Sequence, residues 1–253
     1  MYAPERQQAI LGRARSEGRV DVNSLADVFD VTPETIRRDL TGLERRGVLR
    51  RVHGGAIPVE RLGIEPAVEQ RYDVNAVQKE RIAKAALDQL PDGGSIIIDA
   101  GTTTVRFAEI LPTDRDLTVV THALPIASML AERTNITLHL VGGRIRPGTL
   151  AAVGNWSARE LAEVFVDVAF LGTNGVSPSH GLTTPDLAEA AVKTALMRSA
   201  RRTVVLADHS KFGRDDFAHV ADLSEVDTII TDSEVDADMA REIEEAGPEV
   251  VRA

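Results

Sequence analysis

The sequence predicts an α/β protein in which a mostly parallel sheet domain follows a small N-terminal winged helix-turn-helix domain. Seven short apolar stretches alternate with helical stretches after residue 78, and two closely spaced amphipathic helices precede residue 47. The charge is also unevenly divided. The first 60 residues contain 10 basic and 9 acidic residues, whereas the rest of the chain contains 19 basic and 30 acidic residues. We therefore expect a DNA-binding domain over residues 1–57, a linker over residues 58–77 and an α/β domain over residues 78–253.

The composition excludes several classes of protein and site. With 43% hydrophobic residues in 253, the chain is expected to fold around a core of ordinary size. No apolar run reaches the ~18 residues of a membrane span, and the polar first eight residues are unlike a signal peptide, so we expect a cytoplasmic protein without a membrane partner. Cysteine is absent and the six histidines are scattered, so neither a metal site nor a cofactor is predicted.

The N-terminal elements follow from apolar spacing and from capping residues. A first helix is expected over residues 5–17, and a short strand over residues 20–22, where valines alternate with a polar residue. A second helix is expected through residues 25–29, with Asn23 or Ser24 as its N-cap. A tight connection then leads to a third helix. This order is that of a helix-turn-helix.

The third helix has the clearest start signal in the chain. Thr32 can accept a hydrogen bond from a free backbone N–H, and Pro33 suits the first helical position because its missing donor is not needed there. Ile36, Leu40 and Leu43 share one face at spacings of four and three residues, which leaves arginine and threonine on the opposite face. Arginine can bind guanine edges in the major groove, or phosphates. We therefore expect a recognition helix.

A short hairpin over residues 48–56 is expected to form the wing, with Leu49 and Val52 facing inward and basic side chains facing outward. These arginines could instead be the solvated side of an amphipathic helix. The basic cluster continues across Gly47 into the hairpin, however, and that continuity favours DNA binding. The residues predicted to contact operator DNA are Thr32, Glu34, Thr35, Arg37, Arg38, Thr41, Arg45, Arg50, Arg51 and His53.

The second domain alternates strands with helices, which is typical of a parallel sheet covered on both faces. A helix is expected over residues 79–90. The seven expected strands span residues 95–99, 117–121, 136–141, 167–172, 203–208, 227–231 and 249–251. Because ligands of such sheets bind beyond the carboxyl ends of the strands, the residues that follow each strand are the candidates for a binding site.

These positions hold polar residues or glycine. The loop after the first strand offers backbone N–H groups and three threonine hydroxyls to a phosphate, and the other strand ends add carboxylates, amides and cations. The predicted effector-binding residues are Asp99, Gly101, Thr102, Thr103, Thr104, Thr121, His122, Gly142, Gly143, Arg144, Gly172, Asn174, Asp186, Glu189, Lys193, Asp208 and Lys211.

Some of these residues also have an ordinary structural interpretation. A loop rich in glycine and threonine can simply cap a helix. Asp186 and Glu189 have the spacing of a capping box, and Glu189 with Lys193 has the spacing of an exposed helical ion pair. The spacing alone leaves both readings open for these three residues. Lys211, close behind Asp208 at a strand end, points more strongly to a ligand.

The N-terminal pattern resembles a known family. Residues 20–56, VDVNSLADVFDVTPETIRRDLTGLERRGVLRRVHGGA, resemble the signature of DeoR-type bacterial repressors through TIRRDL and HGGA. The resemblance implies that residues 32–45 form the recognition helix. The family usually has serine at the position of Thr32, which preserves the capping hydroxyl.

The second half resembles the DeoR-type sensor domain through DAGTTT, VGGRIR, VAFLGTNGV, GLTTPDLAEAAVK and LADHSKFG. The resemblance implies a fold related to ribose-5-phosphate isomerase and a phosphorylated sugar that releases the protein from its operator. It is closest to actinobacterial members associated with fructose utilisation, which implies fructose 1-phosphate as the effector. His122 departs from the family, which commonly has asparagine there.

Two other classes of function remain to be weighed. Asp99, Asp208, Lys193 and Lys211 could supply acid–base chemistry, so a sugar-phosphate isomerase with a DNA-binding appendage is the alternative to a regulator that is not an enzyme. A pure scaffold would leave the polar strand ends unexplained. Because one small winged domain gives limited specificity, we expect a homodimer or homotetramer that binds symmetric operator DNA.

Overall fold

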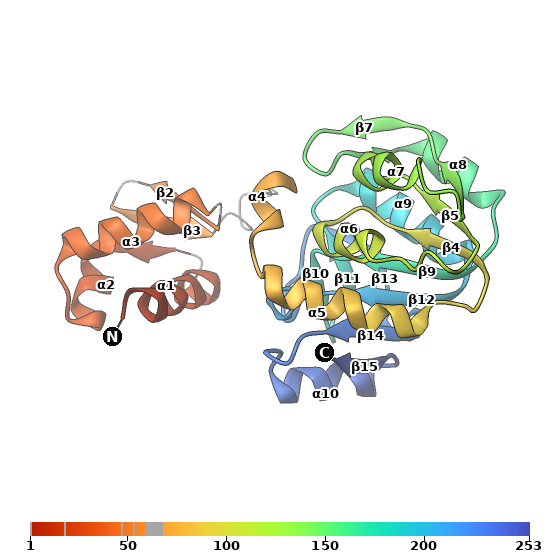
Figure 1. The fold of residues 1–253 in the computed structure, drawn as a ribbon. Coiled ribbons are helices and arrows are strands. Elements are labelled where there is room, and N and C mark those ends of the chain that lie inside the picture. The colour runs from red at the N-terminus through yellow and green to blue at the C-terminus, as the bar shows by residue number, and fades with distance from the viewer. Residues whose placement is uncertain (1, 18, 47, 53, 59–67) are drawn as a thin grey trace. The chain divides into compact units, whose positions relative to one another are not determined.

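The computed structural model describes residues 2–17, 19–46, 48–52, 54–58 and 68–253. The chain divides into two compact units, residues 1–74 and residues 75–253 (Figure 1). Each unit has its own hydrophobic core. Part of the predicted linker, residues 59–67, lies outside the described residues.

The first unit is a winged helix. Ile10, Leu25, Ile36, Leu40 and Leu49 are fully buried in its core. The three strands form an antiparallel sheet in the order β1-β3-β2, and β2 and β3 are the wing. The elements are α1 (Ala3–Glu17), β1 (Val20–Asp21), α2 (Val22–Phe29), α3 (Pro33–Arg45), β2 (Leu49–Val52), β3 (Gly55–Pro58) and α4 (Val68–Tyr72), the last of which falls within the predicted linker.

The start of α3 is confirmed, whereas the predicted start of α2 is wrong. Thr32 caps α3 with its hydroxyl, which accepts from the backbone N–H of Thr35 at 3.3 Å, and Pro33 opens the helix. The N-cap of α2 is Asp21, because its carboxylate accepts from the backbone N–H groups of both Asn23 and Ser24. The Asp21 carboxylate therefore takes the backbone donors that a cap at either predicted position would leave free. The strand β1 ends at Asp21, one residue earlier than predicted.

The second unit is built on a seven-stranded parallel sheet in the order β15-β14-β12-β9-β4-β5-β6. Its strands are β4 (Gly94–Ile98), β5 (Leu117–Thr121), β6 (Ile136–Leu140), β9 (Val166–Gly172), β12 (Ala200–Leu206), β14 (Thr228–Thr231) and β15 (Glu249–Arg252). All seven predicted strands are present, each within three residues at either end of its predicted bounds, which confirms the parallel α/β class.

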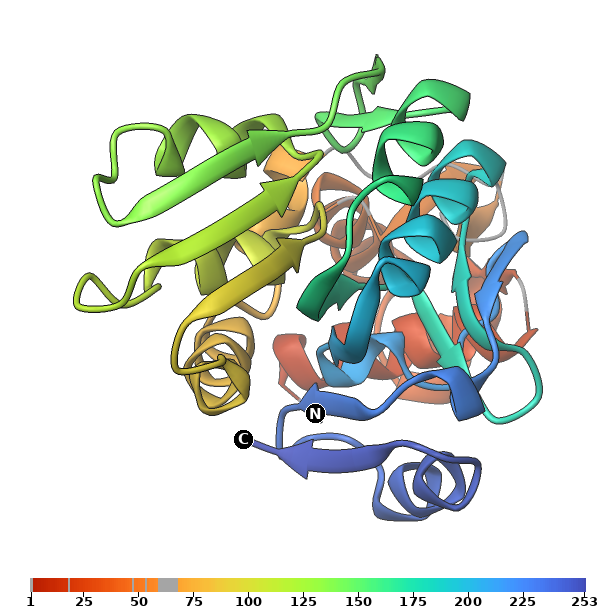
Figure 2. The ribbon, with the colours of Figure 1, turned by 90° about the vertical axis from the view of Figure 1, so that its right-hand side faces the viewer.

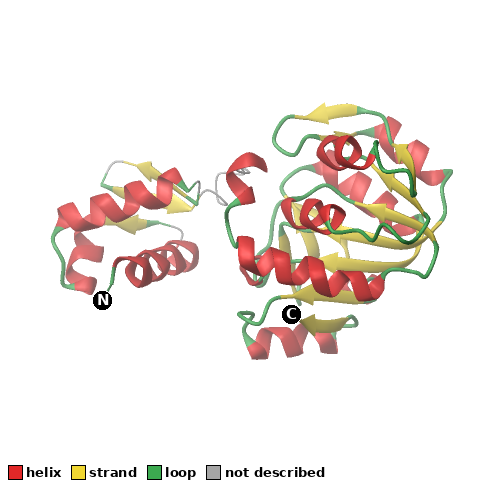
Figure 3. Ribbon diagram, viewed as in Figure 1, coloured by secondary structure: helices red, strands yellow, loops and turns green. Residues whose placement is uncertain are grey.

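Helices lie on both sides of this sheet (Figure 3). Phe170 packs against Phe107 of α6, with ring centres 4.4 Å apart, whereas its neighbour Leu171 faces the opposite side and joins the core beneath α9. The helices are α5 (Ala76–Ala86), α6 (Thr102–Glu109), α7 (Leu124–Leu130), α8 (Asn155–Ala162), α9 (Leu187–Arg198) and α10 (Ala237–Glu245), with short 3-10 turns η2 (Leu87–Gln89), η3 (His209–Lys211) and η4 (Leu223–Glu225).

Two antiparallel additions were not predicted. They are the hairpin of β7 (Arg144–Arg146) with β8 (Ala151–Val153), and a three-stranded sheet of β10 (Gly175–Ser177), β11 (Gly181–Thr184) and β13 (Ala218–Ala221). Each strand is three or four residues long, which is too short for an alternating pattern to stand out. The hairpin and the small sheet nevertheless supply residues to the candidate site.

Candidate functional site

The exposed face of α3 is cationic, as predicted. Arg38 and Arg45 on the helix and Arg50 on the wing are exposed, and none of them has an ion-pair partner among the described residues. Arg37 is exposed and pairs with Glu34 at 3.3 Å. Unpaired arginines are available to phosphates or base edges.

Two of the predicted DNA contacts also join the wing to the helix. Thr41 donates to the carbonyl oxygen of Arg37 at 2.8 Å, and Arg51 donates to the Thr41 hydroxyl at 3.4 Å. The backbone N–H of Arg51 also donates to Glu44. The wing is thereby held beside α3. His53 lies outside the described residues, so its predicted role stays a prediction.

The buried side of α3 holds an ion pair that the sequence analysis missed. Arg6 of α1 donates to Asp39 at 2.6 Å, and both side chains are buried. Gln7 donates to the other Asp39 oxygen at 3.0 Å and accepts from Arg46 at 2.8 Å. The signal was present in the sequence, because Asp39 is three residues from Ile36 and so lies on the apolar face.

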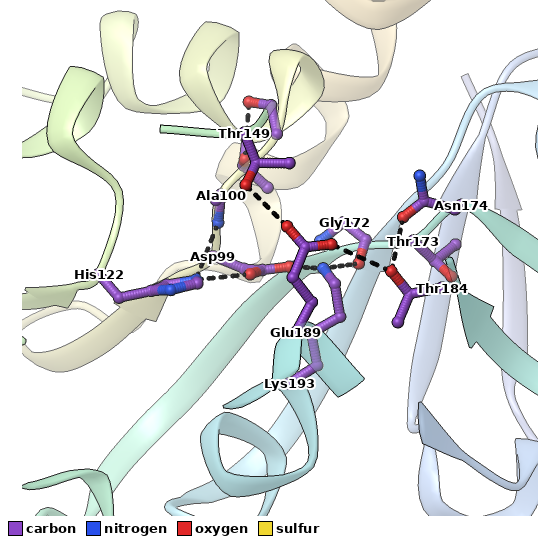
Figure 4. Close-up of polar contacts among 12 residues, drawn as sticks. Asp99, Ala100, His122, Thr149, Gly172, Thr173, Asn174, Thr184, Glu189 and Lys193 are labelled. Carbon is purple, nitrogen blue, oxygen red and sulfur yellow. Dashed lines mark hydrogen bonds and ion pairs between the residues drawn. The ribbon is translucent and has the colours of Figure 1, made fainter. Parts of the chain in front are cut away.

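In the second unit, Asp99 is the centre of a buried polar cluster at the carboxyl edge of the sheet (Figure 4). It follows β4 and is fully buried. Its carboxylate contacts the ammonium of Lys193 and accepts from the backbone N–H of Gly172 at 2.9 Å, while Lys193 also donates to the Gly172 carbonyl oxygen at 2.8 Å. Burial alone would raise the pKa of Asp99, but Lys193 and the hydrogen bond to His122 outweigh it and hold the pKa at about 2.

His122 links this cluster to β8. Its Nδ1 lies 2.8 Å from the carbonyl oxygen of Ala152 and therefore donates a proton to it. Its Nε2 lies 2.9 Å from Asp99 and 3.3 Å from the backbone nitrogen of Ala100. Nε2 accepts from Ala100 when the ring is neutral and donates to Asp99 when the ring is doubly protonated. His122 is thus held by Ala152 of β8 on one side and, on the other, by Asp99 and Ala100 in the loop between β4 and α6.

Glu189 forms a second buried centre next to Asp99 (Figure 4). Its carboxylate accepts from Thr149 at 2.7 Å, from Thr184 at 3.2 Å and from Arg146 at 3.3 Å. The ion pair that the spacing allowed between Glu189 and Lys193 does not form, because Lys193 reaches Asp99 instead.

Of the capping box that the spacing of Asp186 and Glu189 allowed at the start of α9, only the Asp186 half forms. Asp186 does cap the helix, accepting from the backbone N–H groups of Ala188 at 2.9 Å and of Glu189 at 3.0 Å. The side chain of Glu189 turns inward to Thr149 and Thr184 rather than back to the cap. The buried hydroxyls of Thr149 and Thr184 therefore take the place of the backbone N–H of Asp186 as partners of the Glu189 carboxylate.

The loop before α6 is the one in which the sequence predicts a phosphate-binding cradle. Thr102, Thr103 and Thr104 are buried at the first turn of the helix, and no side chain caps their backbone N–H groups. The hydroxyl of Thr104 donates to the Gly101 carbonyl oxygen at 3.0 Å. Uncapped N–H groups at a helix start favour an anion.

Asp208 is buried at the end of β12 and is surrounded by donors and cations. Asn75 donates to it at 2.8 Å, and the backbone N–H of Ser210 at 3.1 Å. Burial would raise the pKa of Asp208, but Lys211, then the hydrogen bonds of Ser210 and Asn75, and finally Lys79 lower it. Asn75 and Lys79, at the start of α5, were not predicted, because a lysine near a helix start looks like an ordinary surface residue.

Three predicted residues, Thr121, Gly142 and Gly143, serve the fold at this edge. Thr121 donates to the Ile98 carbonyl oxygen at 2.7 Å and accepts from the Ala123 N–H, so its hydroxyl is already used. The backbone N–H of Gly142 donates to Glu160 of α8, and a Cβ on Gly143 would lie 2.2 Å from the Ser157 hydroxyl. Arg144 is exposed, and Arg146, two residues later, is the arginine that reaches Glu189. The remaining predicted residue, Asn174, lies 3.1 Å from the Thr184 hydroxyl.

One group of metal-ligand type forms although no such cluster was predicted. His209, Asp232 and Glu234 lie together at the ends of β12 and β14. Asp232 accepts from His209 at both its backbone N–H and its Nδ1, and Arg81 lies 3.9 Å from Glu234. Internal partners therefore account for all three side chains.

Comparison with known proteins decides the family. Residues 6–61 match the family model of the DeoR-like helix-turn-helix domain, and residues 74–233 match that of the DeoR C terminal sensor domain. The chain belongs to the DeoR family. As in other DeoR-family regulators, a DNA-binding helix-turn-helix domain is joined here to a sensor domain, which confirms the family and the order of domains expected from the sequence.

Relatives match this DeoR-family chain along nearly its whole length. The HTH-type transcriptional regulator GlpR of Haloferax volcanii is 39% identical over 251 residues, covering 99% of this chain and 98% of that protein. The glycerol-3-phosphate regulon repressor of Escherichia coli is 30% identical over 233 residues, covering 92% of each. Among solved structures, ribose 5-phosphate isomerase A from Methanocaldococcus jannaschii covers 55% of each chain with a TM-score of 0.41 and 21% identity. In the described residues, every helix is too short or too polar to span a bilayer.

Proposed function

We propose that this DeoR-family regulator represses a carbohydrate-utilisation operon and is released from its operator by a phosphorylated sugar. The observation that carries the proposal is the edge of the parallel sheet, where the uncapped start of α6 lies beside the buried carboxylates Asp99 and Glu189. The first feature suits a phosphate and the second suits hydroxyl groups. The relatives are named as regulators, one of them as repressor of a glycerol-3-phosphate regulon, which supports the same class of effector.

Each part of the effector has residues suited to it. Backbone N–H groups of Thr102, Thr103 and Thr104 would bind the phosphate, and Lys79 and Lys211 would add positive charge beside Asp208. Glu189 and Asn174 offer oxygen acceptors to sugar hydroxyls. Fructose 1-phosphate is our first candidate, because it combines one phosphate with several hydroxyl groups on a small ring.

The charges argue for a sensor rather than an isomerase. A general base works best when its pKa lies near the operating pH. The pKa of Asp99 is about 2, and that of Asp208 is also lowered, so both carboxylates are weak bases at neutral pH. Lys193 is committed to Asp99 and to the Gly172 carbonyl oxygen. The cluster is arranged to hold charge in place, as a binding site requires.

Operator binding would use the exposed arginines of α3 and the wing. Arg38 is our first candidate for a base contact, since it is exposed and has no ion-pair partner among the described residues. Arg45, Arg50 and Arg51 would contact phosphates or bases beside it. A homodimer or homotetramer would present two such helices to a symmetric operator.

The test is a release assay with the full chain on a labelled promoter fragment from its own gene neighbourhood. Fructose 1-phosphate, fructose 6-phosphate, glycerol 3-phosphate and unphosphorylated fructose are titrated into the complex. Release by one phosphorylated sugar and not by fructose is the expected result. Equal inertness of all four compounds, or steady turnover of a sugar phosphate at enzyme-like rates, would overturn the proposal.

A further inference from the structure

The outer face of α8 and α9 carries an apolar groove that the proposed function does not use. The two helices lie next to each other on one face of the sheet, α8 in green and α9 in cyan in Figure 2. The groove between them has a volume of about 500 Å³. Ala158 and Ala162 of α8 and Ala191 and Ala195 of α9 line it. Alanines leave a hollow into which a larger side chain fits.

A large aromatic side chain stands exposed at this groove. Phe165 lines the groove with 64% of its surface exposed. The guanidinium carbon of Arg201 lies 5.6 Å from the centre of the Phe165 ring, in a cation–π contact that holds the ring in place. Leu187 at the start of α9 is also exposed. Aromatic residues exposed in this way are enriched at protein interfaces.

The groove also carries one charge of each sign. Glu163 and Arg198 both line it, both are exposed, and neither has an ion-pair partner among the described residues. A twofold axis through the groove would place Glu163 of one copy opposite Arg198 of the other, twice. A surface that binds itself must be self-complementary, so a projection needs a hollow on the same surface and a charge there needs an opposite charge. This face contains all of them.

We propose that the α8–α9 groove binds the same face of a second copy of the chain across a twofold axis. Phe165 of each copy would fill the alanine-lined hollow of its partner, with the pairs of Glu163 and Arg198 at the rim. The interface depends neither on DNA nor on the effector, so it can be tested without either. If the interface forms, two recognition helices belong to one assembly.

Charge reversal gives the sharpest test, because both positions are exposed and tolerate substitution in the monomer. The mass of the full chain is measured by sedimentation velocity over a range of micromolar concentrations. Glu163→Arg alone and Arg198→Glu alone should each weaken self-association about tenfold or more, and the double variant E163R/R198E should restore it. A double variant as weak as the single variants would overturn the proposed pairing.

Substitutions in the groove test the apolar contact. Phe165→Glu and Ala191→Glu should halve the mass of the assembly, whereas Ile110→Glu, an exposed position at the end of α6, should leave it unchanged. Circular dichroism checks that each variant is folded. A monomeric wild type, or folded groove variants of unchanged mass, would overturn the proposal.

Discussion

Lys193 of α9 contacts the carboxylate of Asp99 at the end of β4, and both side chains are buried. The pair joins β4, which lies beside the central strand β9, to the helix that also supplies Glu189. Two charges out of water are stable only as partners, because their desolvation is offset by their mutual attraction and by hydrogen bonds. Here Gly172 supplies a further donor and a further acceptor to the pair. The candidate site therefore contains a buried ion pair that also joins α9 to the sheet.

Removing the cation should destabilise the second unit strongly. Lys193→Met leaves Asp99 as an uncompensated buried charge, for which we expect a loss of ~3–5 kcal/mol in the free energy of unfolding. Urea unfolding followed by Trp156 emission reports on this unit. Lys84→Met, at an exposed position on α5, is the matched control and should change the free energy by less than ~0.5 kcal/mol. A loss below ~1 kcal/mol in Lys193→Met would show that the pair is not compensated as we infer.

Acid should remove the contribution of Asp99 to stability. Its pKa is lowered from 3.8 to about 2, so the ionised form stabilises the folded state fully above pH 3.8 and this contribution is lost as the pH falls toward 2. The difference corresponds to about 2 kcal/mol. The pKa of Asp208 is lowered as well and adds to the same dependence.

The double variant D99N/K193M separates the two carboxylates, since it removes the charged pair together and keeps Asp208. Urea unfolding between pH 3 and pH 6 should be less dependent on pH in this variant than in the wild type. Identical pH dependence of the two proteins would assign the whole effect to other groups.

Elements of the fold could be predicted where their burial in the core requires a clear pattern of apolar residues in the local sequence. Strands such as β9 and β12 are covered on both faces and read as continuous apolar runs, so their existence was evident. The start of α3 was evident because Thr32 and Pro33 act locally. By contrast, the cap of α2 was misassigned because Asp21 competes with two equally suitable neighbours, and only geometry selects among them.

The candidate site was predictable in its location but not in its connections. Topology alone places Asp99 and Asp208 at the same sheet edge. The cation beside each carboxylate could not be read from the sequence. Lys193 lies 94 residues after Asp99 in the chain, and Lys79, which lowers the pKa of Asp208, belongs to helix α5. Arg146 reaches Glu189, whereas Arg144, the predicted effector residue two positions earlier, is exposed, and the β7–β8 hairpin that carries both was not predicted.

Operator binding should depend on Arg38. If this exposed side chain contacts a base edge, Arg38→Ala weakens binding by ~1–3 kcal/mol and relaxes preference at one operator position. Fluorescence anisotropy with a labelled operator measures the change. Arg13→Ala on α1, which removes an exposed ion pair with Glu17, is the control in the same unit. Binding of the sugar phosphate should stay the same in both variants. Unchanged operator affinity in Arg38→Ala would remove this residue from the readout.

The buried pair of Arg6 and Asp39 should set the stability of the first unit. Asp39→Ala removes a buried charged acceptor from both Arg6 and Gln7, so we expect a loss of ~3–5 kcal/mol and unfolding of this unit at a lower temperature. Amide hydrogen exchange followed by mass spectrometry resolves the two units separately. Glu34→Ala removes an exposed pair on the same helix and should cost less than ~1 kcal/mol. Loss of protection in residues 75–253 would contradict an effect confined to the first unit.

Glu189 should affect the effector response without affecting DNA binding. The carboxylate accepts from Thr149, Thr184 and Arg146, and glutamine would turn one of its two acceptor oxygens into a donor that faces these donors. We expect Glu189→Gln to destabilise the second unit by ~1–3 kcal/mol and to raise the concentration of sugar phosphate needed for operator release about tenfold or more. Operator affinity without effector should equal that of the wild type, since the arginines of α3 are untouched. Glu242→Gln, an exposed position on α10, controls for the change of charge. A Glu189→Gln protein that releases its operator at the wild-type effector concentration would place the sugar elsewhere on the sheet edge.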